Sequence, residues 1–214
     1  MRKYLVIGNP IEHSLSPLLH NFWIKKHNIN ALYKKQLLEK NDVEKILSDV
    51  RASRFHGINV TVPFKNTVIP FLDQLSDTAQ KTQSVNTIFK SQNKLVGDNT
   101  DVYGFSEAIK LTNFNPANKK ALILGAGGVV PSVIVALKNM RFYEIILSNR
   151  TKEKAVNLKK NFPFLKVINW GETIKSDLII NATSIGIKPN EEIKLDYTKS
   201  VSYTHLTLPT NREV

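Results

Sequence analysis

The sequence predicts an α/β protein built from two successive units. Short apolar segments alternate with helical stretches along most of the 214 residues, which is typical of sheets connected by crossover helices. The segment 119–125 (KKALILG) is a continuous apolar run, as expected of a buried central parallel strand. A glycine-rich turn follows this run directly and opens the next helix, so the second unit has the strand–turn–helix order of α/β folds.

The first half of the chain predicts strands joined by helices. Ser16 is expected to cap a helix that has Pro17 at its first position, and Asn41 or Asp42 is expected to cap the next one. Residues 91–93 read as the turn of a hairpin. The expected strands span 3–8, 31–38, 57–63, 86–90 and 94–98, and the expected helices run over about 16–27, 42–54 and 102–112.

The second half begins near Asn118. Its expected strands span 119–125, 143–149, 164–168 and 177–183. One helix follows the glycine turn and runs to about Met140, and Thr151 opens another. The tail 201–214 departs from this alternation and has no clear strand or helix signal, and we expect it to be foreign sequence that does not belong to the rest of the protein.

Composition excludes several classes of protein. No apolar run approaches the roughly 20 residues of a membrane helix, and no signal peptide is recognisable, so we expect a cytoplasmic protein. The absence of cysteine excludes disulfides and thiolate metal sites, and the histidines lack metal-ligand spacing, so no metal is expected. The net charge is +12, but the lysines are scattered along the chain, which argues against a nucleic-acid partner.

The glycine turn predicts a dinucleotide site. Gly125 permits a tight turn, and Gly127 lets the backbone approach a pyrophosphate at the N-terminus of the following helix. The turn also contains Ala126, Gly128 and Val129. Val130 stands where the usual fingerprint has Gly or Ala, which puts close packing of helix against strand in doubt. A glycine turn that binds nothing is the simpler alternative.

The second strand of this unit ends in residues that favour NADP over NAD. Folds that bind NAD usually carry Asp or Glu about 20 residues beyond the glycines, to hold the ribose hydroxyls. This chain has Asn149 and Arg150 there, followed by Thr151 and Lys154. An arginine pairs with a 2′-phosphate, which an acid would repel.

Polar residues gather where the strands of the first half end. They lie in four motifs, GNPIEHSLSP (8–17), NVTVPFK (59–65), SVNT (84–87) and GDNTD (97–101). Strand ends are where α/β folds bind ligands. Hydroxyls, amides, one carboxylate and one ammonium suit a polyhydroxylated ring acid; the residues are Ser14, Ser16, Asn59, Thr61, Lys65, Asn86 and Asp101.

These motifs, in this order, closely resemble those of the shikimate dehydrogenase family. The resemblance runs from about residue 4 to about residue 197. Seven motifs stand in register: GNPIEHSLSPLLHN, GINVTVPFK, VNT, GDNTDVYGF, ILGAGG, SNRT and INATSIG. The resemblance implies reversible, NADPH-dependent reduction of 3-dehydroshikimate to shikimate, in the chorismate route to aromatic amino acids. It also implies a substrate-binding catalytic domain (1–101) followed by a Rossmann-like NADP-binding domain (102–200) that is incomplete.

The resemblance also implies roles for individual residues. Ser14 and Ser16 would bind the substrate carboxylate, and Lys65 and Asp101 would be catalytic. Whether Lys65 donates a proton or only stabilises the charge on the ring oxygen stays open. The remaining substrate contacts would be Asn59, Thr61 and Asn86. The cofactor contacts would be Asp77 (a looser match), Gly125, Ala126, Gly127, Gly128, Val129, Asn149, Arg150, Thr151 and Lys154.

The chain departs from the family in two places. Thr82-Gln83-Ser84 stands where the family prefers small apolar residues and glycine. Family members are also longer, roughly 260–290 residues, and their C-terminal segment returns to the first domain with a substrate-binding glutamine. We therefore expect a C-terminally truncated form with an uncovered sheet edge that is unstable or weakly active. Near-full turnover and a cooperative melt would contradict this.

Two alternatives remain open. One is a relative that takes quinate or uses NAD, and the other is an inactive fragment that only binds dinucleotide. The sequence does not fix the oligomeric state, and a homodimer remains open.

Overall fold

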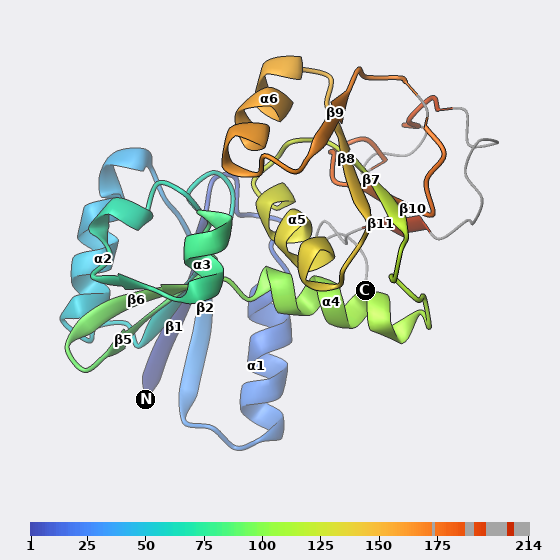
Figure 1. The fold of residues 1–214 in the computed structure, drawn as a ribbon. Helices are drawn as coiled ribbons and strands as arrows, with labels where there is room; N and C mark the ends of the chain where they lie inside the picture. Colours follow the sequence, from blue (N-terminus) through green and yellow to red (C-terminus); the bar gives the residue numbers. More distant parts are fainter. Residues whose placement is uncertain (173, 187–190, 196–204, 208–214) are drawn as a thin grey trace. The chain divides into compact units, whose positions relative to one another are not determined.

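The chain divides into two compact units, one from Met1 to Thr100 and one that begins at Asp101 (Figure 1). The computed structural model describes residues 1–172, 174–186, 191–195 and the backbone of 205–207. Both units combine strands and helices, which confirms the predicted α/β class.

The first unit is built on a mixed sheet with strand order β2-β1-β3-β5-β6-β4. β1 (Arg2–Gly8) pairs in parallel with β2 (Ala31–Leu37) and β3 (Gly57–Val60). β5 (Thr87–Ser91) runs antiparallel to both β3 and β6 (Lys94–Asp98). Because of these directions, the C-terminal ends of β1, β3 and β6 and the start of β5 share one edge of the sheet.

Helices cover both faces of this sheet. Alternate residues of β1 point to opposite faces, as in any strand: Val6 packs with Ile11 and Tyr33 near α1 (Ser16–Lys26), and Leu5 and Ile7 join the larger core. That larger core includes the apolar face of α2 (Val43–Arg51). Figure 1 shows α1 and α2 on opposite sides of the strands.

The predicted hairpin is confirmed. Gln92 and Asn93 connect β5 to β6, and both have positive φ, 46° and 65°. Two such residues in succession make a turn whose twist matches that of the flanking strands.

The second unit contains a parallel sheet with strand order β11-β10-β7-β8-β9. Its strands are β7 (Lys120–Leu124), β8 (Glu144–Ser148), β9 (Lys166–Ile168), β10 (Leu178–Asn181) and β11 (His205–Thr207). One face packs against α4 (Asp101–Leu111), α5 (Val130–Asn139) and α6 (Lys152–Asn161). On the other face Leu122, Leu124, Ile146 and Ile168 pack with side chains that include Trp170 and Ile193.

Val130 packs more closely than its place in the glycine fingerprint suggested. Its side chain is fully buried, as are Val133 and Ile134, and all three belong to the core between α5 and the sheet. The doubt about close packing of helix against strand was therefore wrong, because Val130 itself fills part of the core that α5 shares with β7.

Three local expectations were also wrong. Ser16 is the first residue of α1 rather than its cap; Leu15 occupies the cap position, and the Ser14 hydroxyl accepts a hydrogen bond from the Ser16 N–H at 3.4 Å. The strand expected over 57–63 ends at Val60, because the chain turns where Phe64 N–H bonds to the Thr61 carbonyl. In the tail, where no strand was expected, residues 205–207 form β11, which pairs with β10; that the tail is foreign sequence stays a prediction.

The segment between β3 and β5 holds elements that the sequence did not reveal. They are η2 (Ile69–Phe71), β4 (Gln74–Leu75) and α3 (Asp77–Thr82). The short η1 (Lys40–Asp42), which lies earlier in the chain before α2, was also not expected. α3 is capped by Ser76, whose hydroxyl accepts from Ala79 N–H at 3.1 Å. These pieces are too short to leave a periodic apolar pattern.

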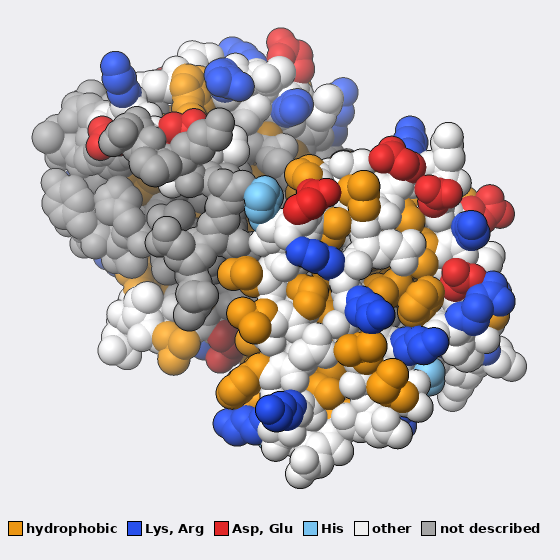
Figure 2. Space-filling model, turned by 180° about the vertical axis from the view of Figure 1, so that it is seen from behind, with side chains coloured by type: hydrophobic (Ala, Val, Ile, Leu, Met, Phe, Trp, Pro, Cys, Tyr) orange, Lys and Arg blue, Asp and Glu red, His pale blue; other side chains and the backbone are white. Residues whose placement is uncertain are grey.

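Basic side chains are dispersed over the described part of the face seen in Figure 2, among acidic and hydrophobic ones. None of the helices in the described part of the chain combines the length and apolar character that crossing a membrane requires.

Gln83 ends α3 in the left-handed conformation, with φ 49° and ψ 39°. Alanine is strained in this conformation and glycine is not. The free energy of unfolding of Gln83→Gly should therefore be roughly 1 kcal/mol higher than that of Gln83→Ala. At Lys81, inside the same helix, the order should reverse, with Gly below Ala by about 0.5–1 kcal/mol. Urea unfolding of the four variants tests this, and the same order at both positions would contradict it.

Candidate functional site

The glycine turn after β7 is closed on one side and open on the other. Gly125 has φ +113°, and a Cβ on it would lie 2.6 Å from the carbonyl oxygen of Ala182. A Cβ on Gly128 would meet nothing within 4 Å. The turn is therefore pressed against the chain after β10, while its outer side leaves room for a ligand.

Backbone hydrogen bonds fix this turn at the end of the sheet. Gly125 N–H bonds to the Ser148 carbonyl and Ala182 N–H to the Leu124 carbonyl, each at 2.8 Å. α5 begins five residues after Gly125, with Pro131 in its first turn, where a missing N–H costs little. The first N–H groups of such a helix, and its positive dipole end, attract an anion.

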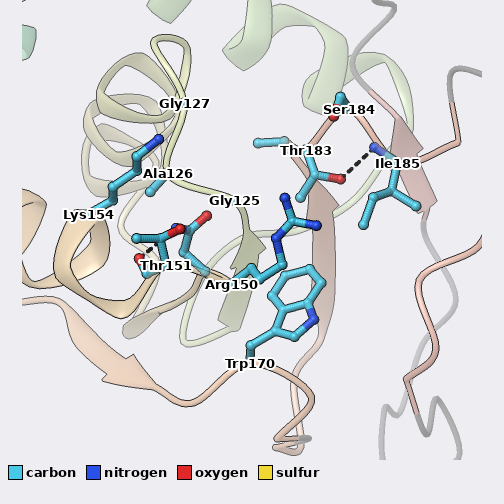
Figure 3. Close-up of a pocket in the computed structure, with 12 residues that line it drawn as sticks. Gly125, Ala126, Gly127, Arg150, Thr151, Lys154, Trp170, Thr183, Ser184 and Ile185 are labelled. Atoms are coloured by element: carbon cyan, nitrogen blue, oxygen red, sulfur yellow. Dashed lines mark hydrogen bonds between the residues drawn. The ribbon is translucent and has the colours of Figure 1, made fainter.

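A pocket of about 250 Å³ opens beside the turn (Figure 3). It brings together most of the predicted cofactor residues: Gly125, Ala126, Gly127, Asn149, Arg150, Thr151 and Lys154. Gly128 and Val129 belong to the same turn but are not among the residues that line this pocket. The structure therefore joins the glycine turn and the end of β8 in one cavity.

The end of β8 makes this cavity basic. Arg150 and Lys154 are both exposed, and none of the described residues that line the pocket is Asp or Glu. The Asn149 side chain donates to the Thr151 carbonyl at 2.7 Å, which holds the start of α6 in place. A phosphate on the 2′ position of a ribose fits this set of donors, because both cations can reach it and no carboxylate opposes it.

Sequence reasoning missed a third wall of the pocket. It consists of Trp170, Ala182, Thr183, Ser184 and Ile185. Thr183 donates to the Asn181 side-chain oxygen at 2.7 Å and accepts from Ile185 N–H at 3.0 Å, a contact drawn in Figure 3. The INATSIG motif (180–186) could have indicated the last four of these residues, since it lies at the end of a strand of the same sheet, whereas no motif contains Trp170.

A second polar cluster lies at the shared strand edge of the first unit. The Asn59 side chain donates to the Asn86 carbonyl at 3.2 Å and to the Thr87 hydroxyl at 3.1 Å. Its oxygen accepts from the Tyr33 hydroxyl at 2.6 Å. Asn86 in turn accepts from Thr100 N–H at 3.0 Å. These bonds fix the orientation of both amides before any ligand arrives.

Tyr33 supports this cluster from β2, which β1 separates from β3. Burial raises the pKa of its phenol, so the group stays a hydrogen-bond donor at any physiological pH. The ring of His20 stacks on it at 4.2 Å, and Asn21 bonds to both its N–H and its carbonyl. Neither Tyr33 nor Thr100 was singled out from the sequence.

The loops that carry the other substrate candidates are joined to this edge. A Cβ on Gly8 would lie 2.5 Å from the Thr61 methyl group, and Asn9 N–H bonds to the Val62 carbonyl at 2.9 Å. The loop after β1, which holds Ser14 and Ser16, is therefore anchored beside the loop after β3.

The three remaining candidates lie at different places. The Lys65 carbonyl accepts from Val85 N–H at 2.8 Å, which places this half-buried lysine next to the segment that leads to Asn86. Asp101 is the first residue of α4, immediately after Thr100. Asp77 is exposed at the start of α3 and does not line the pocket beside the glycine turn.

Among the described residues, no group of three or more His, Asp or Glu side chains is arranged to hold a metal ion.

Two family models match the chain. The first, described as the shikimate dehydrogenase substrate binding domain, matches residues 6–88. The second, described as shikimate/quinate 5-dehydrogenase, matches residues 107–188. Together they cover both units.

Curated relatives and solved structures agree. The chain is 57% identical over 198 residues to a shikimate dehydrogenase (NADP(+)) of Pelagibacter ubique, covering 92% of this chain and 75% of the relative. The Aquifex aeolicus shikimate dehydrogenase structure matches with a TM-score of 0.86 at 38% identity, covering 94% and 75% of the two chains. The Thermus thermophilus structure in complex with NADP(H) and shikimate has a TM-score of 0.79 at 33% identity, covering 87% and 70%. The chain thus spans about three quarters of the length of the Pelagibacter relative.

The close approach of Gly125 to Ala182 gives a sharp expectation. Gly125→Ala should lower the free energy of unfolding by roughly 2 kcal/mol or more, since it adds backbone strain and a clash with a carbonyl. Gly128→Ala, where a Cβ meets open space and φ lies outside the left-handed range, should change it by no more than about 0.5 kcal/mol. Chemical denaturation without ligand checks both, and equal losses would refute the geometry.

Proposed function

Since the chain belongs to the shikimate dehydrogenase family, we propose that it catalyses the reversible, NADPH-dependent reduction of 3-dehydroshikimate to shikimate. The relatives at 57% and 40% identity carry the name shikimate dehydrogenase (NADP(+)). The reaction makes the chain an oxidoreductase of chorismate and aromatic amino-acid biosynthesis. We assign residues 1–101 to the substrate and residues 102–200 to the cofactor.

The observation that carries the proposal is the basic pocket beside the glycine turn. It combines a turn open to an anion with Arg150 and Lys154, and it lacks an acid among its lining residues. An NAD site would place a carboxylate near the ribose hydroxyls, whereas a 2′-phosphate needs cations. NADP is therefore the cofactor that suits these residues.

The polar edge of the first unit suits the substrate. Ser14 and Ser16 would hold its carboxylate, and Asn59, Thr61 and Asn86 would bind its ring hydroxyls. The hydrogen bonds from Tyr33 and Thr100 orient the two amides in advance, which reduces the entropy lost on binding. Asp77 keeps a proposed cofactor role only through its match to the family motif.

Two residues would carry the chemistry. When bound, NADPH supplies a hydride to the ring ketone. Lys65 would stabilise the negative charge that develops on the ring oxygen and supply its proton, and Asp101 would hold the same oxygen as a hydroxyl. Both residues belong to motifs at the ends of strands, and they come from different parts of the chain.

A cytoplasmic location and a homodimer remain expectations from the sequence. Quinate as substrate, NAD as cofactor, or binding without turnover are the outcomes that would replace the proposed reaction.

An absorbance assay in the NADPH band, with shikimate and NADP, tests the reaction directly. Lys65→Ala should lower kcat by about 10²- to 10⁴-fold and change KM far less, because its contribution belongs to the transition state. Lys45→Ala, an exposed lysine on α2, is the matched control and should keep the parent kcat. A Lys65→Ala effect confined to KM would contradict a chemical role, and faster turnover with quinate would replace the substrate.

Cofactor choice can be tested by binding alone. Arg150→Ala should raise the Kd for NADP by about 10- to 100-fold, since it removes charge-assisted hydrogen bonds to the 2′-phosphate. The Kd for NAD should change by less than about threefold. Lys159→Ala, near the other end of α6, controls for the loss of one positive charge. Calorimetry measures the Kd values of the parent chain and of both variants. An equal rise in the Kd for NADP and for NAD in Arg150→Ala would argue against recognition of the phosphate.

A further inference from the structure

Trp170 is the aromatic side chain among the residues that line the basic pocket. It is half-buried and follows β9, at the end of a segment that no sequence motif singled out. Its indole shares the pocket with the Arg150 guanidinium, and Figure 3 shows both side chains in the same part of it.

The strand register explains why these two residues meet. β8 and β9 are parallel neighbours in which Ser148 pairs with Ile168. Arg150 and Trp170 each stand two residues beyond that pair. Since paired strands lie about 4.8 Å apart, both side chains leave the sheet at adjacent points of one edge.

The indole is held by the structure beneath it. Its ring packs against the core of Leu122, Leu124, Ile146 and Ile168. The preceding residue, Asn169, accepts from the Ser148 hydroxyl and from the Lys152 ammonium, each at 3.0 Å. Gly171 then turns the chain with φ +83°. A fixed aromatic face loses little entropy when a flat ligand stacks on it.

The other groups in the pocket determine which flat ligand this would be. The glycine turn suits the pyrophosphate, and Arg150 with Lys154 suits the 2′-phosphate. Adenine is attached to the ribose that carries this phosphate, so it must lie within one sugar of Arg150. We propose that Trp170 forms one face of the adenine slot and that its indole stacks on the base. This inference rests on the proposed NADP site and adds a recognition residue to it.

Adenosine 2′,5′-bisphosphate is the probe, because it carries the base and the 2′-phosphate without the nicotinamide. The chain has two tryptophans, so Trp23→Phe leaves Trp170 as the only indole reporter. In that background the probe should quench the fluorescence of Trp170, and inorganic pyrophosphate should not. Trp170→Leu, which keeps apolar volume, should raise the Kd of the probe by about tenfold, and Trp170→Phe by about threefold or less.

The outcomes separate this inference from the proposed function. If calorimetry shows that the probe binds while Trp170 fluorescence and the Kd of Trp170→Leu stay unchanged, the stacking role is wrong and the NADP site stands. If neither the probe nor NADP binds to a chain that melts cooperatively, both the stacking role and the proposed cofactor are wrong. Equal weakening by Leu and Phe would point to packing rather than stacking and would also overturn the inference.

Discussion

The contact between Gly125 and the Ala182 carbonyl is the constraint on which the cofactor pocket depends. It lets β7 end directly against the chain that leaves β10, so the glycine turn, the residues after β8 and the residues 182–185 after β10 line one cavity. A side chain at position 125 would force these strand ends apart by more than a packed sheet tolerates. The residues that line this pocket follow the ends of parallel strands, and the register of those strands sets their spacing.

The first unit reaches the same result by a different route. Its sheet is mixed, and the start of an antiparallel strand joins the C-terminal ends of three others at one edge. Amides and hydroxyls bond to one another there, and the phenol of Tyr33 on β2 reaches across β1 to support them. Both units therefore place polar side chains at the ends of strands, where the backbone is held by the sheet and the side chains can still reach a ligand.

Prediction from sequence succeeded where a residue type leaves few options. The run 119–125 and the Gln92-Asn93 turn were interpreted correctly, because burial and positive φ each restrict the choice. Asn149 and Arg150 line the pocket beside the glycine turn, and their role in cofactor binding stays a prediction. Prediction failed where tertiary contacts decide. Tyr33 and Trp170 look like ordinary apolar residues of a strand and a loop, and only the pairing of β1 with β2 and of β8 with β9 brings them to the sites. Likewise, the burial of Val130 follows from the packing of α5, which a fingerprint of glycines does not describe.

The hydrogen bonds of Asn59 limit what this position can distinguish. Both N–H groups of its amide are directed to the protein, and its oxygen uses one lone pair on Tyr33. If Asn59 contacts the substrate as proposed, it offers a ring substituent only an acceptor, so an alcohol can pair with it and a carbonyl cannot. A compound with a ketone at that carbon would place two oxygens against each other, and the scaffold would select against it by electrostatic repulsion rather than by size.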